Sequence, residues 1–593
     1  MSLRTARRAV RGKLIEWRAL AAAQLSFERV DRRRLGIVVF SAAVLASFAY
    51  ALWLGHGQTL ILDEWKFLLD SRKWSVAMLE PDNGHLILLP YVVSKLVYGT
   101  FGLSSHLPSQ LVAVFLNAVI AALLYVFARR SIGPLFALLP GVLMLFYGTS
   151  WDAIVIGYQL PNLLTMAAGL FALLFIRRED LRGDALACVA LFLSLASFSV
   201  GVAFVVGVAV ALLLRGRAAA ISRAWVVLLP VFFYAVWFVW SIHLRQSEGS
   251  IYNVGALLSG MFDQLAAVLA GITGLATAPG IRDLTTVVER PDWGPALVIL
   301  ALVGAALWLK DKRPTPSLIV ASSVLVAYLA AIALGLNIEG HRVPNASRYV
   351  YMGTVLTLLV FIELFRGMKP TRGWAAVLAI AFVFSLLANG AVMGMGGKLV
   401  RLESATNRAQ LGALETARNR VSNDFVIESA EHTTMSNPDM LFDAGAYFEV
   451  TDSLGSSAYS EGQLEGAPEQ AREAADMLLA RALPISVRPG FHPARGASIA
   501  VVEGDGSRRG NGCLLVTPRA GSSRVVVKVP SGGLSYSVAP KEQPELKLRR
   551  FGEGFAVVPE LPLGSARVEI PTDRSDRPWQ AELVTASRLE LCP

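Results

Sequence analysis

The hydropathy pattern changes once along the chain, at about residue 397. Before this point, long apolar runs alternate with short polar stretches, whereas the almost 200 residues after it are mainly polar. A helix that crosses a hydrocarbon core of about 30 Å needs roughly 20 apolar residues, and somewhat fewer where the bilayer is thinned. The pattern therefore predicts a polytopic α-helical membrane protein with a C-terminal domain outside the bilayer.

Eleven apolar segments satisfy the length requirement. The run after residue 184 is divided at 197–201, because a single helix of that length would extend beyond the membrane. The eleven segments are approximately 36–55, 108–128, 131–148, 160–176, 184–198, 200–214, 224–243, 293–309, 317–336, 350–366 and 374–394.

The basic residues between the segments test this count. Lys and Arg tend to stay on the cytoplasmic side, and with eleven crossings every basic cluster falls on that side. The clusters are Arg129 and Arg130; Arg177, Arg178 and Arg182; Arg215, Arg217 and Arg223; Lys310, Lys312 and Arg313; and residues 366–372. Two further stretches, 86–101 and 253–275, are also apolar. If either crossed the membrane once, the basic clusters would no longer all fall on the cytoplasmic side. We therefore expect both stretches to lie at the outer surface or to dip into it.

The N-terminal segment 1–35 carries ten Lys or Arg and three acidic residues. We expect it to stay in the cytoplasm, where the helical spacing of apolar positions 14–25 predicts an amphipathic helix on the inner leaflet. The chain has a net charge of +10 and 54% hydrophobic residues. Because the cations cluster beside apolar runs, they indicate contact with an anionic membrane surface and not with nucleic acid.

The odd number of crossings places the C-terminus outside. Segments 398–422 and 468–482 have helical spacing, which predicts a helical linker region over 397–484. From 485 to 593, short β-branched runs alternate with Gly, Pro, Asp and Ser turns, a pattern typical of a β-sandwich or jelly roll. These runs are 498–502, 513–517, 524–529, 555–558 and 567–570.

The chain has three cysteines. Cys188 falls in an apolar segment, whereas Cys513 and Cys592 both belong to the predicted outer β-rich domain, where disulfides are permitted. A bridge between them would close a loop of about 80 residues and contribute roughly 4 kcal/mol in the chain-entropy model. Two unrelated free thiols are the alternative.

Adjacent carboxylates, Asp63 and Glu64, follow the first apolar segment at the start of a predicted outer loop. The same loop contains Asp82-Asn83-Gly84-His85. A carboxylate at this depth can face an aqueous pocket at the headgroup level. The alternative is a solvated pair that complements the dipole at a helix N-terminus.

This loop carries a family resemblance. An acidic pair directly after the first span, an Asn-Gly-His turn, a surface helix and a second span that ends in Arg-Arg together resemble the GT-C superfamily of polyprenyl-phosphate-sugar-dependent glycosyltransferases. The resemblance covers roughly residues 36–400 as architecture, and it implies a transmembrane catalytic domain over 36–396. With its added outer β-rich domain, the layout is similar to that of actinobacterial arabinofuranosyltransferases.

The resemblance implies an inverting sugar transfer on the outer side of the membrane from a lipid-linked donor. Asp63 matches the first-loop acid of the family, which acts as general base on the acceptor hydroxyl, and Glu64 is its possible substitute. The leaving polyprenyl phosphate requires cations. Candidates for this role are Arg348, His341, Arg342 and His85.

Other residues are candidates for binding the acceptor. The short second outer loop offers Asp152, Gln159 and Asn162 as hydrogen-bond partners for a sugar, and Tyr349 follows Arg348 at the lip of the tenth segment. For Asp152 a helix-capping role is the alternative. For Arg348 and Tyr349 it is a plain interfacial anchor.

The sequence assigns no metal or cofactor. The seven histidines are scattered and form no Cys/His cluster. An oxygen-ligated Mg²⁺, Mn²⁺ or Ca²⁺ could bind at Asp63 or Asp152.

The sequence therefore predicts a glycosyltransferase that moves a sugar from a polyprenyl-phosphate donor to a glycan, lipid or protein acceptor in cell-envelope assembly. A transporter or flippase for lipid-linked glycans is one alternative, although such proteins commonly have broken helices and internal repeats. A non-catalytic assembly protein is another.

Overall fold

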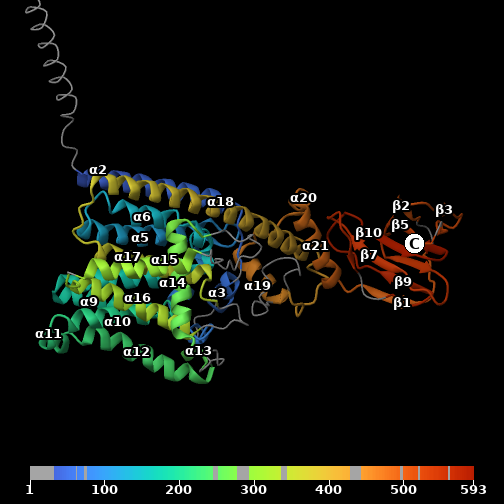
Figure 1. Cartoon of the computed structure of the whole chain (residues 1–593). Coiled ribbons are helices and arrows are strands. Elements are labelled where there is room, and N and C mark those ends of the chain that lie inside the picture. The colour runs from blue at the N-terminus through green and yellow to red at the C-terminus, as the bar shows by residue number, and fades with distance from the viewer. Residues whose placement is uncertain are drawn as a thin grey trace, which may run out of the picture.

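The computed structural model describes residues 32–61, 63–71, 76–244, 252–276, 293–310, 312–335, 343–427, 443–494, 498–518, 521–557 and 561–593. Most of the predicted amphipathic segment 1–35 therefore lies outside the described residues, as do His341 and Arg342. Figure 1 shows a helical bundle at one end, a β-rich unit at the other, and one long helix that joins them.

Each of the eleven predicted apolar segments contains a helix, although in the segment 131–148 the helix α6 covers only Leu138–Leu145. The corresponding helices are α2 (Arg32–Leu54), α5 (Leu107–Ser131), α6 (Leu138–Leu145), α8 (Leu160–Phe175), α9 (Leu181–Leu195), α10 (Val202–Leu213), α12 (Trp225–Ser241), α15 (Trp293–Leu309), α16 (Pro316–Leu334), α17 (Ser347–Leu364) and α18 (Arg372–Thr416). Within the described residues, eight helical stretches are long and apolar enough to cross a membrane. Helices α9, α10 and α15 are shorter.

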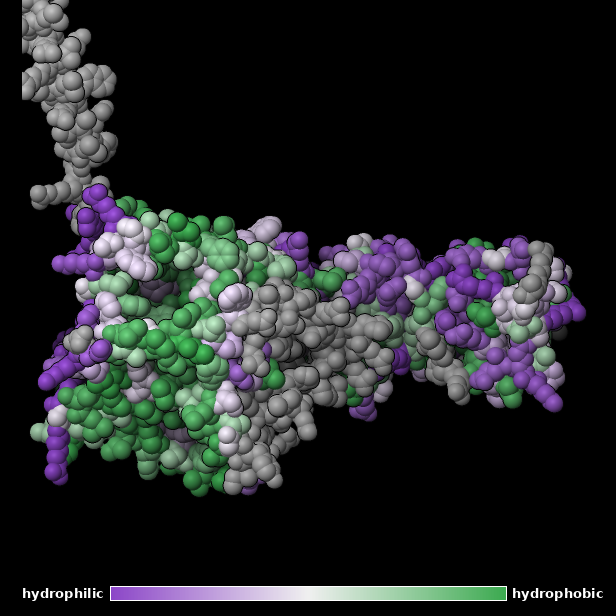
Figure 2. All heavy atoms as spheres, in the orientation of Figure 1, coloured by the Kyte–Doolittle hydropathy of each residue, from purple (hydrophilic) through white to green (hydrophobic). Residues whose placement is uncertain are grey.

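The outer surface of the bundle is apolar. Large side chains such as Leu45 on α2, Val239 on α12, Leu300 on α15 and Ile380 on α18 are between 68 and 72% exposed. Figure 2 shows hydrophobic residues over the bundle and hydrophilic residues over the C-terminal unit, with a second hydrophilic margin at the far end of the bundle. An apolar surface of this extent is stable in hydrocarbon and not in water, as expected for a polytopic membrane protein.

The two apolar stretches that were not counted as crossings also form helices, α4 (Leu88–Phe101) and α14 (Leu257–Thr273). In Figure 1, α14 runs across the neighbouring helices at the end of the bundle nearest the C-terminal unit. Side chains of α18 hold its last turn, because Ser385 Oγ donates to the carbonyl of Ile272 (2.7 Å) and Asn389 Nδ2 to that of Gly271 (3.1 Å).

Helix α18 differs from the prediction. The sequence predicted two helices, 374–394 and 398–422, whereas the structure has one helix of 45 residues. The polarity of the side chains changes near residue 397, but the backbone hydrogen bonds of a helix are indifferent to this change. Gly396 and Gly397 allow close packing, since an added Cβ would lie 2.1 Å from the ring of Trp151 and 2.6 Å from Leu54 respectively.

The C-terminal unit begins with three helices, α19 (Ala444–Leu454), α20 (Glu461–Glu465) and α21 (Glu469–Ala482). The last of these agrees with the predicted helix 468–482. The strands that follow are β1 (Ser486–Pro489), β2 (Ala500–Glu503), β3 (Ser507–Arg508), β4 (Leu514–Val516), β5 (Ser523–Lys528), β6 (Leu534–Ser537), β7 (Glu545–Arg549), β8 (Ala556–Val557), β9 (Ser565–Glu569), β10 (Gln580–Thr585) and β11 (Leu589–Cys592).

These strands form two antiparallel sheets, in the orders β1-β9-β6-β11-β4-β3 and β2-β5-β10-β7-β8. Each of the five predicted β runs overlaps a strand. Buried residues of both sheets, for example Leu591 and Leu583, belong to one hydrophobic cluster. The β-rich character of the region is confirmed, and the jelly-roll topology stays a prediction.

The same hydrophobic cluster joins the C-terminal unit to the first loop of the bundle. Trp65 and Leu68 of α3 (Asp63–Ser71) and Tyr98 of α4 belong to it. The ring of Trp65 lies edge-on to Tyr447 of α19, with a centroid distance of 5.9 Å. The C-terminal unit therefore packs directly on the loop that carries Asp63 and Glu64.

Cys513 and Cys592 form a disulfide, while Cys188 is a buried free thiol. Their strands are neighbours, because Leu514 of β4 pairs with Leu591 of β11. The bridge spans 79 residues of sequence. It therefore closes the part of the β-rich region from β4 to β11 in one covalent loop.

We expect the double substitution Cys513→Ser and Cys592→Ser to lower the unfolding free energy of the β-rich region by up to about 4 kcal/mol, because the unfolded chain regains its loop entropy. Hydrogen exchange of β4 and β11 in the purified full chain measures this change. The control is Cys188→Ala, which should leave exchange in these strands unchanged. Equal protection with and without the bridge would contradict the expectation.

Candidate functional site

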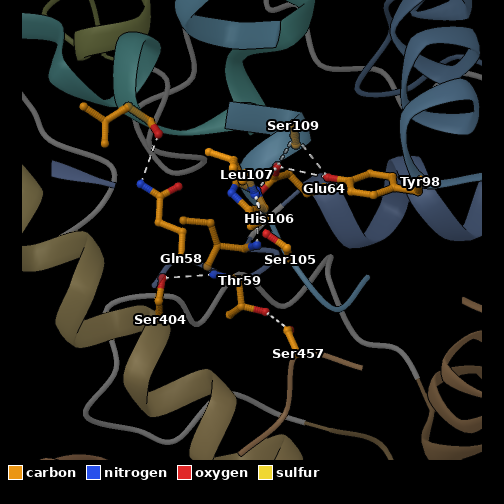
Figure 3. A network of polar contacts seen from close by, with 12 residues as sticks. Gln58, Thr59, Glu64, Tyr98, Ser105, His106, Leu107, Ser109, Ser404 and Ser457 are labelled. Carbon is orange, nitrogen blue, oxygen red and sulfur yellow. Dashed lines mark hydrogen bonds and ion pairs between the residues drawn. The ribbon is translucent and has the colours of Figure 1, made fainter. Parts of the chain in front are cut away.

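Glu64 is buried at the junction of the bundle and the C-terminal unit, with 2% of its surface exposed. Its Oε1 atom accepts hydrogen bonds from His106 Nε2 (2.7 Å), Ser109 Oγ (3.1 Å) and Tyr98 OH (3.2 Å). Its Oε2 atom accepts from the backbone N–H of Ile61 (3.1 Å), three residues earlier, as the Glu of a capping box does. Figure 3 shows these donors converging on the carboxylate.

Among the donors to Glu64, Tyr98 keeps its phenolic proton. Burial raises the pKa of Tyr98 well above its ordinary value, and the charge of the Glu64 carboxylate raises it further. His106 is 3% exposed, and its Nε2 must carry a proton to bond an ionised carboxylate. With both oxygens engaged and water excluded, Glu64 holds its surroundings in place.

Asp63 is the first residue of α3, and Glu64 is the second. The side chain of Asp63 lies outside the described part of the structure. The pair therefore stands at a helix N-terminus, the position at which the sequence left a purely structural role open. Of this pair, the structure describes the side chain of Glu64, which is turned into the protein.

The second predicted outer loop lies against this carboxylate. It contains the 3-10 helices η2 (Gly148–Ser150) and η3 (Gly157–Gln159) and the short helix α7 (Trp151–Val155). A Cβ added to Gly157 would lie 2.4 Å from Glu64 Oε1 and 2.5 Å from Ser109 Oγ. Gln58, just before α3, also donates to the carbonyl of Val155 (3.1 Å). The first two loops therefore converge.

The predicted acceptor residues of the second loop lie together. Gln159 Nε2 donates to Asp152 Oδ2 (3.3 Å), and Asn162 Nδ2 donates to Gln159 Oε1. Asp152, Gln159 and Asn162 are 0, 2 and 6% exposed. In this conformation they form a buried network that fixes the loop.

The late loop joins the same network. Ser347, the first residue of α17, donates through Oγ to Asp152 Oδ2 (2.7 Å), and its carbonyl accepts from Ser150 Oγ (2.8 Å). The next residue is Arg348, whose guanidinium carbon lies 5.1 Å from the centre of the Tyr349 ring. Tyr349 is 9% exposed. The structure thus brings Arg348 and Tyr349 to the edge of the Asp152 network.

His85 lies in a different part of the first loop. Asn83 and Gly84 have positive φ angles of 48° and 78°, so the chain turns back and Asp82 and His85 exchange backbone hydrogen bonds of 2.8 and 3.0 Å. The imidazole packs on Phe198 at a centroid distance of 4.2 Å. His85 therefore sits beside the connection between α9 and α10.

A large apolar groove runs along the bundle from its arginine-rich end to Ser385 of α18. It has a volume of about 1150 Å³, and its lining extends from Thr273 and Ser385 to Lys369 at the other end of the bundle. One turn beyond Ser385, the Asn389 side chain accepts from the Thr149 backbone N–H (3.0 Å) and hydroxyl (2.9 Å). A chain of contacts therefore connects the groove to the second loop.

Comparison with known proteins does not assign the chain to a family. No protein-family model matches the chain, and no curated protein matches it at a significant level. The likeness to GT-C enzymes therefore rests on the short sequence motifs.

Metal ligands do not gather at the candidate site within the described residues. Among the described residues, three potential metal ligands lie together in one place, in the β-rich region. They are Cys513, Glu590 and Cys592, and the two sulfurs of this cluster are joined in the disulfide. Asp152 Oδ2 accepts hydrogen bonds from Ser347 and Gln159.

His106 was missed by the sequence reasoning. It precedes α5, where Pro108 at the second helical position marks the helix start. The sequence signal was an isolated His before a helix, which gives no indication that Glu64, 42 residues earlier, lies at hydrogen-bond distance.

The contact between the loops predicts the effect of a single methyl group. We expect Gly157→Ala to lower the melting temperature of the purified protein by several degrees, because the Cβ would collide with Glu64 and Ser109 and overpacking costs about 1–3 kcal/mol. Thermal unfolding in detergent measures this. Gly99→Ala on α4 is the matched control, since its Cβ would meet nothing within 4 Å; equal melting temperatures for the two variants would contradict the contact.

Proposed function

We propose that this protein is an inverting glycosyltransferase that uses a polyprenyl-phosphate-linked sugar at the outer face of a bacterial inner membrane. The observation that supports the proposal most is the convergence of three loops, represented by Glu64, Gly157 and Ser347, at one end of a bundle that also contains a long apolar groove. A lipid-linked donor needs both elements. Its chain requires an apolar path, and its sugar requires polar groups at the end of that path.

The proposed topology has eleven crossings, with the arginine-rich end of the bundle in the cytoplasm. At that end α5 finishes with Arg129 and Arg130, and Arg366 follows α17. This assignment agrees with the tendency of Lys and Arg to remain inside. It places the converging loops and the C-terminal unit outside, where the β-rich region would contact the growing glycan.

In this proposal Asp63 is the general base. It would remove the proton of the acceptor hydroxyl as that oxygen attacks the anomeric carbon, which inverts the configuration as the polyprenyl phosphate leaves. Glu64 is a positioning residue, because its four hydrogen bonds anchor the backbone next to Asp63. Asp152 holds the second loop and the start of α17 in register through Ser347.

Arg348 is the proposed ligand of the donor phosphate. It follows Ser347 at the start of α17, at the loop end of the bundle. A guanidinium there would stabilise the negative charge that develops on the leaving phosphate.

A flippase for lipid-linked glycans is the second candidate, and the groove is the observation that favours it. Its lining reaches from Lys369 to Ser385, so an isoprenoid chain could lie along it for part of the way across the bundle. Against this candidate, the polar side chains are concentrated in the loops. Transporters more commonly bind their substrate near mid-membrane.

We expect Asp63→Asn to lower sugar transfer by at least about 100-fold, because an amide cannot act as a base. The measurement is glycoside formation from a polyprenyl-phosphate sugar by the full chain in proteoliposomes. Glu80→Gln, at an exposed position of the same loop, is the matched control and should keep wild-type activity.

Two outcomes would overturn the proposal. Full activity of the Asp63→Asn protein would remove the base assignment. Movement of a labelled lipid-linked sugar across the vesicle membrane without acceptor and without any glycoside product would favour the flippase.

The Arg348→Ala substitution tests the phosphate assignment. We expect the KM for the donor to rise about 10- to 100-fold while the KM for the acceptor stays constant, because one charge-assisted hydrogen bond contributes roughly 1.5–3 kcal/mol. Arg348→Lys should recover part of the loss, since it retains the charge. Arg372→Ala at the opposite end of the bundle is the control, and an unchanged donor KM for Arg348→Ala would reduce Arg348 to an anchor.

A further inference from the structure

A second pocket lies at the arginine-rich end of the bundle, away from the converging loops. It has a volume of about 420 Å³ and is bordered by α10, α16, α17 and the 3-10 helix η4 (Ile176–Arg178). Four arginines and one glutamate line it. They are Arg130, Arg177, Arg215, Arg366 and Glu179.

A buried glutamate holds two of the four arginines in place. Glu363 on α17 has a fully buried side chain and forms ion pairs with Arg177 (3.2 Å) and Arg366, and Ser131 Oγ donates to it (3.3 Å). Arg177 also lies 4.6 Å from the centre of the Phe127 ring. Two guanidinium groups are therefore held rigidly at the pocket, and even with Glu363 counted the cations outnumber the carboxylates.

Arg215 retains hydrogen-bonding capacity. One nitrogen, Nη2, donates to the carbonyl of Ile176 (2.8 Å) and lies 3.4 Å from Glu179, whose side chain is 66% exposed. The other nitrogen, Nη1, is buried and has no acceptor among the described residues. A buried guanidinium nitrogen without an acceptor is unfavourable, so an anionic oxygen in the pocket would complete the coordination of Arg215.

The walls of the pocket above the arginines are apolar. Leu173 of α8, Val320 of α16 and Leu359 of α17 line it on the side of the membrane core. A soluble anion would use only the arginines. A phospholipid would use both parts, because its phosphate matches the guanidinium groups and the first methylene groups of its acyl chains match the apolar wall.

We propose that this pocket binds the phosphate group of an anionic phospholipid. In the topology proposed above, the pocket opens toward the inner leaflet. The binding itself does not depend on sugar transfer, so the two proposals can fail separately.

Phosphatidylglycerol is the probe for this site. The experiment measures the thermal unfolding of the full chain in a neutral detergent with phosphatidylglycerol, with phosphatidylcholine, or with inorganic phosphate at the same concentration. We expect a saturable rise in melting temperature with phosphatidylglycerol alone. Native mass spectrometry of the same samples counts the lipid molecules that remain bound.

Three variants locate the effect. Arg130→Gln and Arg215→Gln should each reduce the phosphatidylglycerol-dependent shift by at least half, and the double variant should lose it. Arg129→Gln is the matched control, because it changes the neighbouring arginine of α5, which does not line the pocket. Arg130 is exposed, so its variant tests the site even if Arg215→Gln fails to fold.

Three results would overturn the proposal. An equal phosphatidylglycerol shift in the wild type and in the double variant would place the lipid elsewhere. An equal shift with phosphatidylcholine would remove the requirement for an anion. A shift of the same size with inorganic phosphate would show that the site takes a soluble anion, whatever the outcome of the Asp63→Asn assay.

Discussion

A carboxylate that is removed from water is stable only where donors surround it, and Glu64 imposes this requirement at the junction of the two parts of the molecule. Its donors come from α4, from the start of α5 and from the backbone before α3. These elements can meet only if the first loop folds back over the end of the bundle. The same arrangement presents Trp65 and Leu68 to the C-terminal unit, whose core includes them. The hydrogen bonds that Glu64 accepts on one side of α3 therefore also fix the position of Trp65 and Leu68, which pack against the C-terminal unit on the other side.

The Asp152 network meets the same requirement across longer distances in the sequence. Asp152 and Ser347 are 195 residues apart, and Thr149 and Asn389 are 240 residues apart. Each pair buries polar atoms where helices of the bundle meet, so each atom needs its partner from another part of the chain. The end of the bundle beside the C-terminal unit is therefore cross-linked by side-chain hydrogen bonds.

The sequence predicted the helices of the bundle well, because a hydrocarbon solvent selects apolar runs of a given length. It predicted two helices in place of α18, since a change in side-chain polarity looks like the end of a span. It identified Asp152, Gln159 and Asn162 as a group, which local spacing allows. It could not identify His106 or Ser347 as partners of the two carboxylates, because those contacts depend on tertiary packing. In the β-rich region, β-branched runs revealed five strands, while strands such as β6 (Leu-Ser-Tyr-Ser) carry a weaker pattern.

Helix α18 has a mechanical consequence. A continuous helix of 45 residues is about 68 Å long, and its far end is built into the core of the C-terminal unit through residues such as Ala409 and Leu414. The C-terminal unit is therefore attached to the bundle by a stiff helix that packs along α2. The length of this helix sets the distance between the unit and the bundle. A force applied to the β-rich region would be transmitted as a tilt of α18 within the membrane. The helix also lines the apolar groove through Leu378 and Ser385, so such a tilt would change the width of that groove.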